Sequence, residues 1–187
     1  ATAAAGGVLF LLAAGGITAF RYLEFRSPGF DFGIFTQMFD QMRTTGIPLT
    51  TCERGRSLSH FAVHFSPALY LLLPFYLLFP HPMTLICLQV IGLAAGALPL
   101  GGLCRSLGLS RRTSGWIILA YFAYPALTGG CLYDFHENFM LTPFLLTFLY
   151  LAHTGRLKLA ALAALCVLMV KEDAAIYLLC ASVYLAV

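Results

Sequence analysis

The chain has 187 residues, of which 60% are hydrophobic and only 10% are charged, and its mean hydropathy is +0.85. A soluble globular domain carries about 25% charged residues, so this composition excludes an ordinary soluble protein and indicates transmembrane helices. The formal net charge of +3 is too small for a nucleic-acid-binding surface, and no nucleic acid is expected as a partner.

Apolar runs along the chain predict the membrane-spanning helices. The first covers residues 3–20, and a long loop of mixed polarity, 21–81, follows it. The later spans are predicted over 82–104, 113–129, 139–153, 159–170 and 174–187. The chain begins without Met and ends inside an apolar run, so we expect one membrane domain, 1–187, that is a piece of a longer protein.

Charge is distributed unevenly between the loops. The eight acidic residues can all be placed on one side of the membrane: Glu24, Asp31, Asp40, Glu53, Asp134, Glu137, Glu172 and Asp173. The short turns on the other side carry only basic residues: Arg105, Arg111, Arg112, Arg156 and Lys158. Because cytoplasmic loops are enriched in Lys and Arg, we predict that the acidic loops face outward.

Residues 67–80 (PALYLLLPFYLLFP) are apolar but too short for a span, which needs about 20 residues. If they crossed the membrane, the loop 21–66 would share a side with the basic turns. Placing them along the interface leaves only basic residues in those turns, which we favour. Apolar residues also recur at helical spacing over 32–44, so two interfacial helices are predicted, 32–44 and 67–79.

Two polar motifs lie in the long loop. Asp31 stands before the 32–44 helix, where it is either a plain N-cap or a carboxylate with a function, and the two roles are compatible. His60 and His64 are four residues apart, which on a helix suits a metal pair, but interfacial His residues also bond to loop backbone. Of these two we keep His64 as a candidate site residue.

Three ionisable residues, Asp134, His136 and Glu137, are crowded into the predicted loop between two spans. A loop at the membrane surface is an ordinary place for solvated polar residues. However, carboxylate and imidazole at this spacing can also bind a divalent cation, or orient a phosphate through one. Cys52 and Cys131 fall in predicted outer loops and are able to pair in an oxidising compartment, which spacing alone does not decide.

Lys171, Glu172 and Asp173 interrupt the last apolar run. Each charge at the bilayer centre costs about 2.5–3.5 kcal/mol. The run therefore either breaks into two short helices, 159–170 and 174–187, or directs the charges into a water-filled cavity. Intramembrane ionisable residues are functional candidates by default, although a simple turn with an internal ion pair is the alternative.

Four motifs together carry a resemblance to a known family: FDFGIFTQ, HFAVHFSPALYLLLPFYLLFPHP, LYDFHEN and LMVKEDAA. In this order they resemble the prokaryotic membrane family called domain of unknown function 2079, over about residues 22–187. That family is grouped with the GT-C superfamily of membrane glycosyltransferases. The resemblance implies an all-α polytopic transmembrane helix bundle, similar to the N-terminal module of GT-C enzymes, in a prokaryotic plasma membrane.

The resemblance also implies roles for the site residues. GT-C enzymes have a catalytic Asp early in the first outer loop, a second acidic motif in the next one, and usually a sugar donor on polyprenyl phosphate. Asp31 and Asp134 match these two positions, with His136 and Glu137 orienting the donor phosphate through Mg²⁺ or Mn²⁺. Lys171 would neutralise the phosphate. The remaining substrate-binding candidates are His64, Glu172 and Asp173.

The sequence leaves other functions open. Lys171, Glu172 and Asp173 would serve as an ion or proton relay in a transporter or flippase. A non-catalytic relative would use the same cavity to bind membrane lipid. Thr36 stands in the first motif where we expect Asp from the family pattern, so one carboxylate of that pattern is missing.

Overall fold

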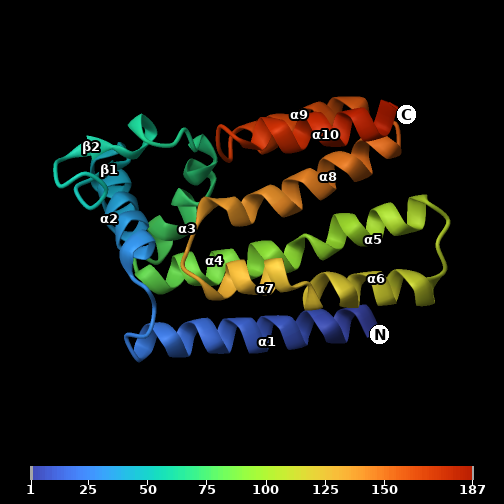
Figure 1. Ribbon diagram of the computed structural model, residues 1–187, viewed down its shortest axis with the longest axis horizontal. Helices are drawn as coiled ribbons and strands as arrows, with labels where there is room; N and C mark the ends of the chain where they lie inside the picture. The colour runs from blue at the N-terminus through green and yellow to red at the C-terminus, as the bar shows by residue number, and fades with distance from the viewer. Residues whose placement is uncertain (1, 187) are drawn as a thin grey trace.

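The computed structural model describes residues 2–186, and it is a bundle of helices with a small β-ribbon at one end (Figure 1). Three helical segments are long and apolar enough to cross a membrane: Ala3–Leu23, Pro82–Ser106 and Arg111–Leu132. These findings confirm the predicted all-α helical bundle.

The elements follow the apolar runs of the sequence with small shifts in their ends. In chain order they are α1 (Thr2–Leu23), α2 (Phe30–Thr45), β1 (Leu49–Thr50), β2 (Leu58–Ser59), the 3₁₀ turns η1 (His60–Ala62) and η2 (Pro67–Leu71), α3 (Leu73–Leu78), α4 (Pro82–Ala95), α5 (Ala97–Ser106), α6 (Arg111–Ala123), α7 (Pro125–Leu132), η3 (Glu137–Met140), α8 (Leu141–His153), α9 (Leu157–Leu168) and α10 (Ala174–Ala186). Val187, the last residue of the predicted final span, lies outside the described residues.

The second and third spans each bend where a residue disturbs the helix. Between α4 and α5 the chain bends at Gly96, three residues before Pro99, which has no amide hydrogen to donate. The hydroxyl of Tyr121 donates a hydrogen bond to the Leu93 carbonyl at 2.6 Å and so satisfies an acceptor at this bend. Between α6 and α7 the break falls at Pro125, the first residue of α7.

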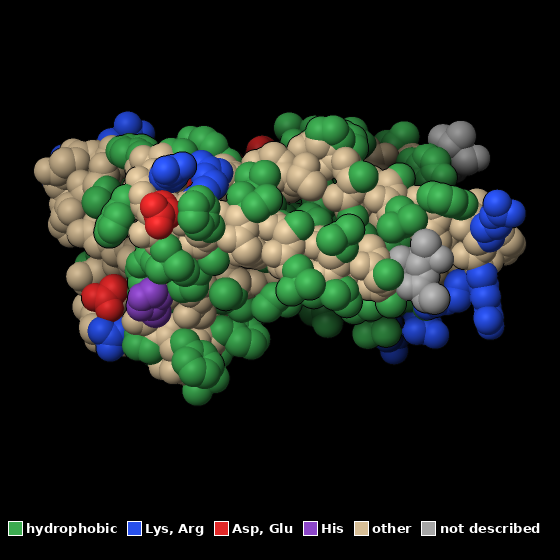
Figure 2. Space-filling model, turned by 90° about the horizontal axis from the view of Figure 1, so that it is seen from below, with side chains coloured by type: hydrophobic (Ala, Val, Ile, Leu, Met, Phe, Trp, Pro, Cys, Tyr) green, Lys and Arg blue, Asp and Glu red, His purple; other side chains and the backbone are tan. Residues whose placement is uncertain are grey.

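The bundle has two different ends (Figure 1). At the loop end lie the connections 24–81 and 133–140, and the turn 169–173 points the same way, whereas at the basic end lie the short turns 107–110 and 154–156. Figure 2 shows Lys and Arg side chains without visible acids at the basic end, and acids, a His and further Lys and Arg side chains at the other. The helices therefore alternate in direction as the sequence predicts.

At the loop end, α2 packs its apolar face on the rest of the molecule, through Phe35, Met38, Phe39 and Met42. This agrees with the amphipathic pattern of 32–44. The single helix predicted over 67–79 is instead divided into η2 and α3. Pro74 is the second residue of α3, a position where its missing N–H leaves no helical bond unmade, so the second piece begins there.

The chain breaks at Lys171, Glu172 and Asp173, between α9 and α10. The 12 residues of α9 rise about 18 Å, whereas the hydrocarbon core is about 30 Å thick. The α9–α10 hairpin therefore starts at the basic end and turns part-way along the bundle (Figure 1). The three charged residues lie in that turn and not at the tip of a full span.

Cys52 and Cys131, whose pairing the sequence left open, are not bonded to each other in the structure. Both thiols are free; Cys52 is exposed in the loop after β1, and Cys131 is buried. The reason is that α7 continues to Leu132, so Cys131 belongs to the packed end of a helix and not to an open loop.

Candidate functional site

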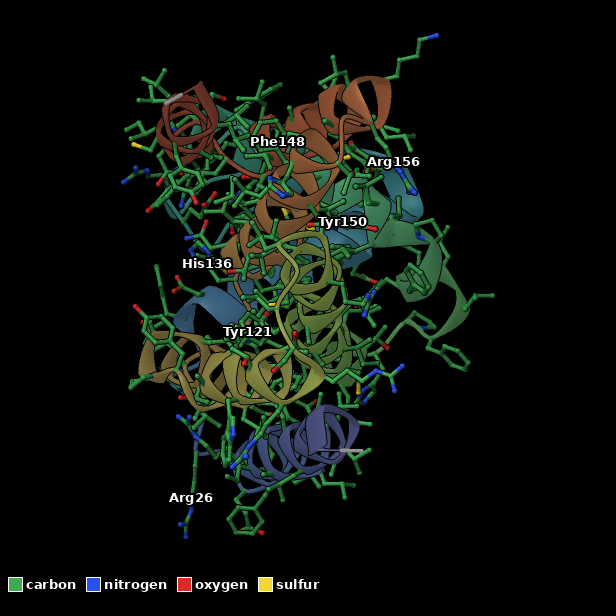
Figure 3. All side chains as sticks on the ribbon, turned by 90° about the vertical axis from the view of Figure 1, so that its right-hand side faces the viewer. Arg26, Tyr121, His136, Phe148, Tyr150 and Arg156 are labelled. Carbon is green, nitrogen blue, oxygen red and sulfur yellow. The ribbon has the colours of Figure 1, made fainter. Side chains whose placement is uncertain are left out.

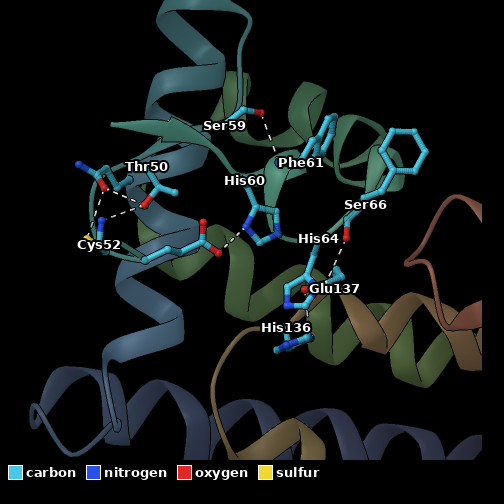
Figure 4. Close-up of polar contacts among 12 residues, drawn as sticks. Thr50, Cys52, Ser59, His60, Phe61, His64, Ser66, His136 and Glu137 are labelled. Carbon is cyan, nitrogen blue, oxygen red and sulfur yellow. Dashed lines mark hydrogen bonds and ion pairs between the residues drawn. The ribbon is translucent and has the colours of Figure 1, made fainter. Parts of the chain in front are cut away.

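A polar cavity of about 250 Å³ opens at the loop end. Its lining comes from α2, from the loop between the strands, from η1 with the residues after it, and from the segment before η3. We call it the polar cavity, and its ionisable lining residues are Asp31, Glu53, Arg54, His60, His64, His136 and Glu137. Figure 4 shows the three imidazoles gathered beside Glu137.

Asp31 lies in the first turn of α2 and borders the polar cavity. It is not the N-cap, because the helix begins one residue earlier and Gly29 occupies that position with a φ of 86°. Within the described chain the Asp31 carboxylate has no hydrogen-bond or ion-pair partner. It is half-buried and available to a ligand.

Asp134 does the capping that the sequence suggested for Asp31. Its Oδ2 accepts hydrogen bonds from the backbone N–H groups of Gly29 and Phe32, at 3.1 and 3.4 Å. These bonds satisfy donors at the start of α2 and place a carboxylate at the positive end of the helix dipole. Burial raises the pKa of Asp134, and the two backbone bonds oppose that rise. Asp134 does not line the polar cavity.

Glu137 is fully buried and connects several candidate residues. Its Oε1 lies 3.4 Å from Lys171 Nζ, and its Oε2 lies 3.0 Å from His136 Nδ1. The hydroxyl of Ser66 donates to Oε1 at 3.4 Å. Because the Lys171 side chain is only 13% exposed, this ion pair is shielded from solvent and holds the α9–α10 turn against the start of η3.

His136 is held by its backbone as well as by its ring. Its N–H donates to Gln89 Oε1 at 2.9 Å, and the Gln89 amide donates to the carbonyls of Cys131 and Asp134. Gln89 lies inside α4, so this network fixes the segment after α7 against a spanning helix. Burial lowers the pKa of His136, which keeps the imidazole neutral at pH 7.

Glu172 ties the α9–α10 turn to the long loop. Its Oε1 lies 2.8 Å from His64 Nδ1. Its Oε2 accepts a hydrogen bond from the Phe65 backbone N–H at 3.1 Å. The bond with His64 is the main reason why the pKa of Glu172 is lowered to about 2. The backbone joins the same two segments, since the N–H of Ala68 donates to the Met169 carbonyl at 2.9 Å.

An apolar groove of about 810 Å³ runs beside the polar cavity. We call it the apolar groove; it lies between α4, α7, α8 and α10 and is lined mainly by Leu, Ala, Gly and aromatic side chains. His136 lines both the groove and the polar cavity. Figure 3 looks along the helices and shows His136 and Tyr121 on this side of the bundle.

The predicted site residues are thus only partly gathered. Four of them line the polar cavity: Asp31, His64, His136 and Glu137. Two more contact those lining residues, Lys171 through Glu137 and Glu172 through His64. The last two do not line the cavity: Asp134, and Asp173, which is exposed. Among the described residues, no three His, Cys, Asp or Glu side chains are grouped to hold a metal ion. The metal at Asp134, His136 and Glu137 therefore stays a prediction that this arrangement does not support.

The polar cavity is also lined by three residues that are not among the predicted site residues: Glu53, Arg54 and His60. Glu53 Oε1 and His60 Nδ1 lie 2.8 Å apart, with side chains only 8% and 2% exposed. A signal was present, because Glu53, Arg54 and Arg56 form the densest charge cluster of the long loop and precede the His60–His64 pair.

Comparison with known proteins assigns the family. Residues 21–187 match the family model described as predicted membrane protein (DUF2079). The chain belongs to this family. It is therefore a membrane protein, as its three long apolar helices also indicate. No curated protein and no solved structure matches the chain.

Proposed function

We propose that this DUF2079 protein is a GT-C-like glycosyltransferase that moves a sugar from a polyprenyl-phosphate donor to an acceptor at the outer face of the membrane. One observation carries the proposal: His136 borders both the polar cavity and the apolar groove. A lipid-linked sugar needs this combination, because its chain requires an apolar surface and its phosphate and sugar require polar groups.

The basic end supports the orientation in this proposal. The turns at that end carry Arg and Lys without acids, which is the pattern of cytoplasmic loops. The polar cavity then faces the periplasmic or extracellular side. The grouping of this family with GT-C enzymes implies the same layout, with the first acidic residue, Asp31, on the outer-loop helix α2.

Asp31 is the general base in this mechanism. The acceptor hydroxyl oxygen attacks the anomeric carbon of the sugar while Asp31 takes the hydroxyl proton. The bond from that carbon to the phosphate oxygen breaks, and polyprenyl phosphate leaves with the electron pair. An unpartnered carboxylate suits the role, since no bond within the described chain must break before it accepts the proton.

The donor phosphate binds on the His136 side of the polar cavity. Arg54 lines the same cavity, next to Glu53 in the chain, and forms no ion pair within the described residues, so its guanidinium is available to the donor. Lys171 acts through Glu137: by neutralising that carboxylate, it keeps a buried negative charge from repelling the donor. Glu137 in turn positions His136. None of these steps requires a metal ion.

The test is the Asp31→Asn variant, assayed as release of polyprenyl phosphate from labelled polyprenyl-phosphate hexoses in membranes that contain the protein and its natural acceptor. We expect at least a hundredfold loss of release, the usual effect of removing a general base. The melting temperature should not change, because the carboxylate bonds to nothing else. Asp40→Asn is the matched control, since Asp40 lies on the same helix but pairs with Arg43. Full activity of Asp31→Asn would remove the base assignment.

A transporter is the second candidate, because Lys171, Glu137 and His136 form a connected chain of ionisable groups beside the short helix α9. It predicts substrate uptake that depends on a pH gradient and that survives Asp31→Asn. Uptake of this kind in proteoliposomes, without release of polyprenyl phosphate, would favour the transporter over the transferase.

A further inference from the structure

We infer that Glu53 and His60 form a sugar subsite, which binds two hydroxyl groups of the glycosyl unit at the side of the polar cavity away from the phosphate. The inference rests on the proposed function and adds the place where the sugar is recognised. It involves residues for which the mechanism above has no role.

The pair is buried but incompletely bonded. Glu53 Oε1 and His60 Nδ1 satisfy each other at 2.8 Å, yet the other polar atom of each side chain, Glu53 Oε2 and His60 Nε2, is buried without a hydrogen-bond partner. Buried polar atoms are almost always paired in folded proteins. Two unpaired atoms on adjoining side chains that line one cavity therefore indicate a ligand, or ordered water, that pairs them.

The chemistry of the two atoms selects the ligand class. The carboxylate holds the Nδ1 proton, so in the neutral imidazole Nε2 is an acceptor, and Glu53 Oε2 is an acceptor as well. Two acceptors on adjoining side chains require two donors, which the hydroxyl groups of a sugar provide. A phosphate offers no such donors, and the Glu53 carboxylate would repel it.

The surroundings fix the subsite in place. The backbone N–H of His60 donates to the Pro48 carbonyl at 2.8 Å, and the ring packs edge-on against Phe35 at 5.5 Å between centroids. Phe35 also contacts the His136 ring at 5.6 Å. The same phenyl ring thus contacts one imidazole on the proposed sugar side and one on the phosphate side.

The size of the cavity agrees with this division. At about 250 Å³ it is slightly below the range of about 300–1,000 Å³ for pockets that take drug-sized ligands. It accommodates a small polar group such as one sugar ring, whereas the polyprenyl chain needs the apolar groove.

Two substitutions of His60 distinguish the role of its unpaired Nε2 from that of Nδ1, which is bonded to Glu53. His60→Asn places an amide near the Nδ1 position, keeps a donor to Glu53 and removes the acceptor at Nε2. His60→Gln places its amide near the Nε2 position. Cys52→Ser is the control, because Cys52 is next to Glu53 in the same loop but does not line the cavity.

The experiment measures the affinity of the purified protein for polyprenyl phosphate and for a series of polyprenyl-phosphate hexoses (glucose, galactose and mannose). We expect at least one hexose lipid to bind the wild-type protein more tightly than bare polyprenyl phosphate. His60→Asn and Glu53→Gln should lower that affinity about tenfold and leave the affinity for polyprenyl phosphate unchanged. His60→Gln should lose less than His60→Asn.

The outcomes distinguish the subsite from the transferase. If no hexose lipid binds better than polyprenyl phosphate, or if the variants weaken both lipids equally, the subsite is overturned and ordered water fills it. If the discrimination holds but no sugar is transferred, the transferase fails while the sugar subsite stands. Unchanged binding of polyprenyl phosphate by the variants also excludes misfolding as the cause of any loss.

Discussion

At the basic end, two short turns join neighbouring helices, whereas at the loop end three segments from distant parts of the chain meet around a cavity. Both basic turns use the same local device: Gly108 and Gly155 adopt φ values of 71° and 72°, and the next N–H reaches back to the carbonyl of Cys104 or Leu151. This is the Schellman helix end, which a few consecutive residues determine.

The loop end is held by contacts between segments instead. Glu137 meets Lys171, Glu172 meets His64, and Asp134 meets the start of α2. Each of these pairs is separated by 34 residues or more in the sequence, and several of the groups are buried. The turns at the basic end are therefore determined by local structure. The loop end is instead stabilised by long-range polar contacts, and the same contacts form the site.

The largest expected effect comes from the buried ion pair. Lys171→Ala leaves the Glu137 carboxylate buried without its cation, and breaking such a pair costs about 3 kcal/mol or more. The matched variant Lys158→Ala removes an exposed Lys at the basic end, and surface changes of this kind stay within about 0.5 kcal/mol. Thermal unfolding of the two purified variants measures the contrast.

A double variant sharpens this result. Lys171→Met combined with Glu137→Gln removes both charges and keeps similar volumes, so it should regain most of the stability that Lys171→Ala loses. If Lys171→Ala and Lys158→Ala were equally stable, the buried ion pair at the loop end would contribute no more to the free energy of unfolding than an exposed Lys at the basic end.

The second effect is local to the start of α2. Asp134→Ala removes the acceptor for the Gly29 and Phe32 N–H groups, and losing a helix cap costs about 1 kcal/mol. Hydrogen exchange at these two amides should speed up, while amides in the middle of α4 should not change. Asp134→Asn retains an acceptor oxygen and should show a smaller effect. Unchanged exchange at Gly29 and Phe32 in Asp134→Ala would show that the cap does not hold this helix.

The sequence predicted those parts of the molecule that depend on neighbouring residues. Apolar runs marked helical segments, of which three are long enough to cross a membrane, and the amphipathic pattern located α2. The break between α9 and α10 at Lys171 is one of the two arrangements that the sequence left open. The depth of that break was not predicted, because 159–170 was expected to span, whereas the 12 residues of α9 are too few to cross the hydrocarbon core.

The parts that sequence reasoning did not predict depend on long-range contacts. Asp31 and Asp134 illustrate this, since either carboxylate suits the start of a helix, and only the fold shows that the one 105 residues away from Gly29 caps it. Glu53 and His60 were passed over for the same reason. Six residues lie between them, and no helical or strand period brings them together, so their pairing follows only from the path of the ribbon β1–β2.

The smallest expected effect concerns pH and the contact between Glu172 and His64. Because the pKa of Glu172 is lowered from 4.5 to about 2 in the folded protein, its contribution to stability is fully present above pH 4.5 and is lost as the pH falls toward 2. The contribution stays below about 1 kcal/mol, because both side chains are well exposed. The difference in melting temperature between wild type and Glu172→Gln should therefore shrink on acidification from pH 5 to pH 3. Asp173→Asn, the exposed neighbour, should show no such pH-dependent difference. A difference for Glu172→Gln that stayed constant across this range would mean that the α9–α10 turn is held to the long loop by its backbone bond alone.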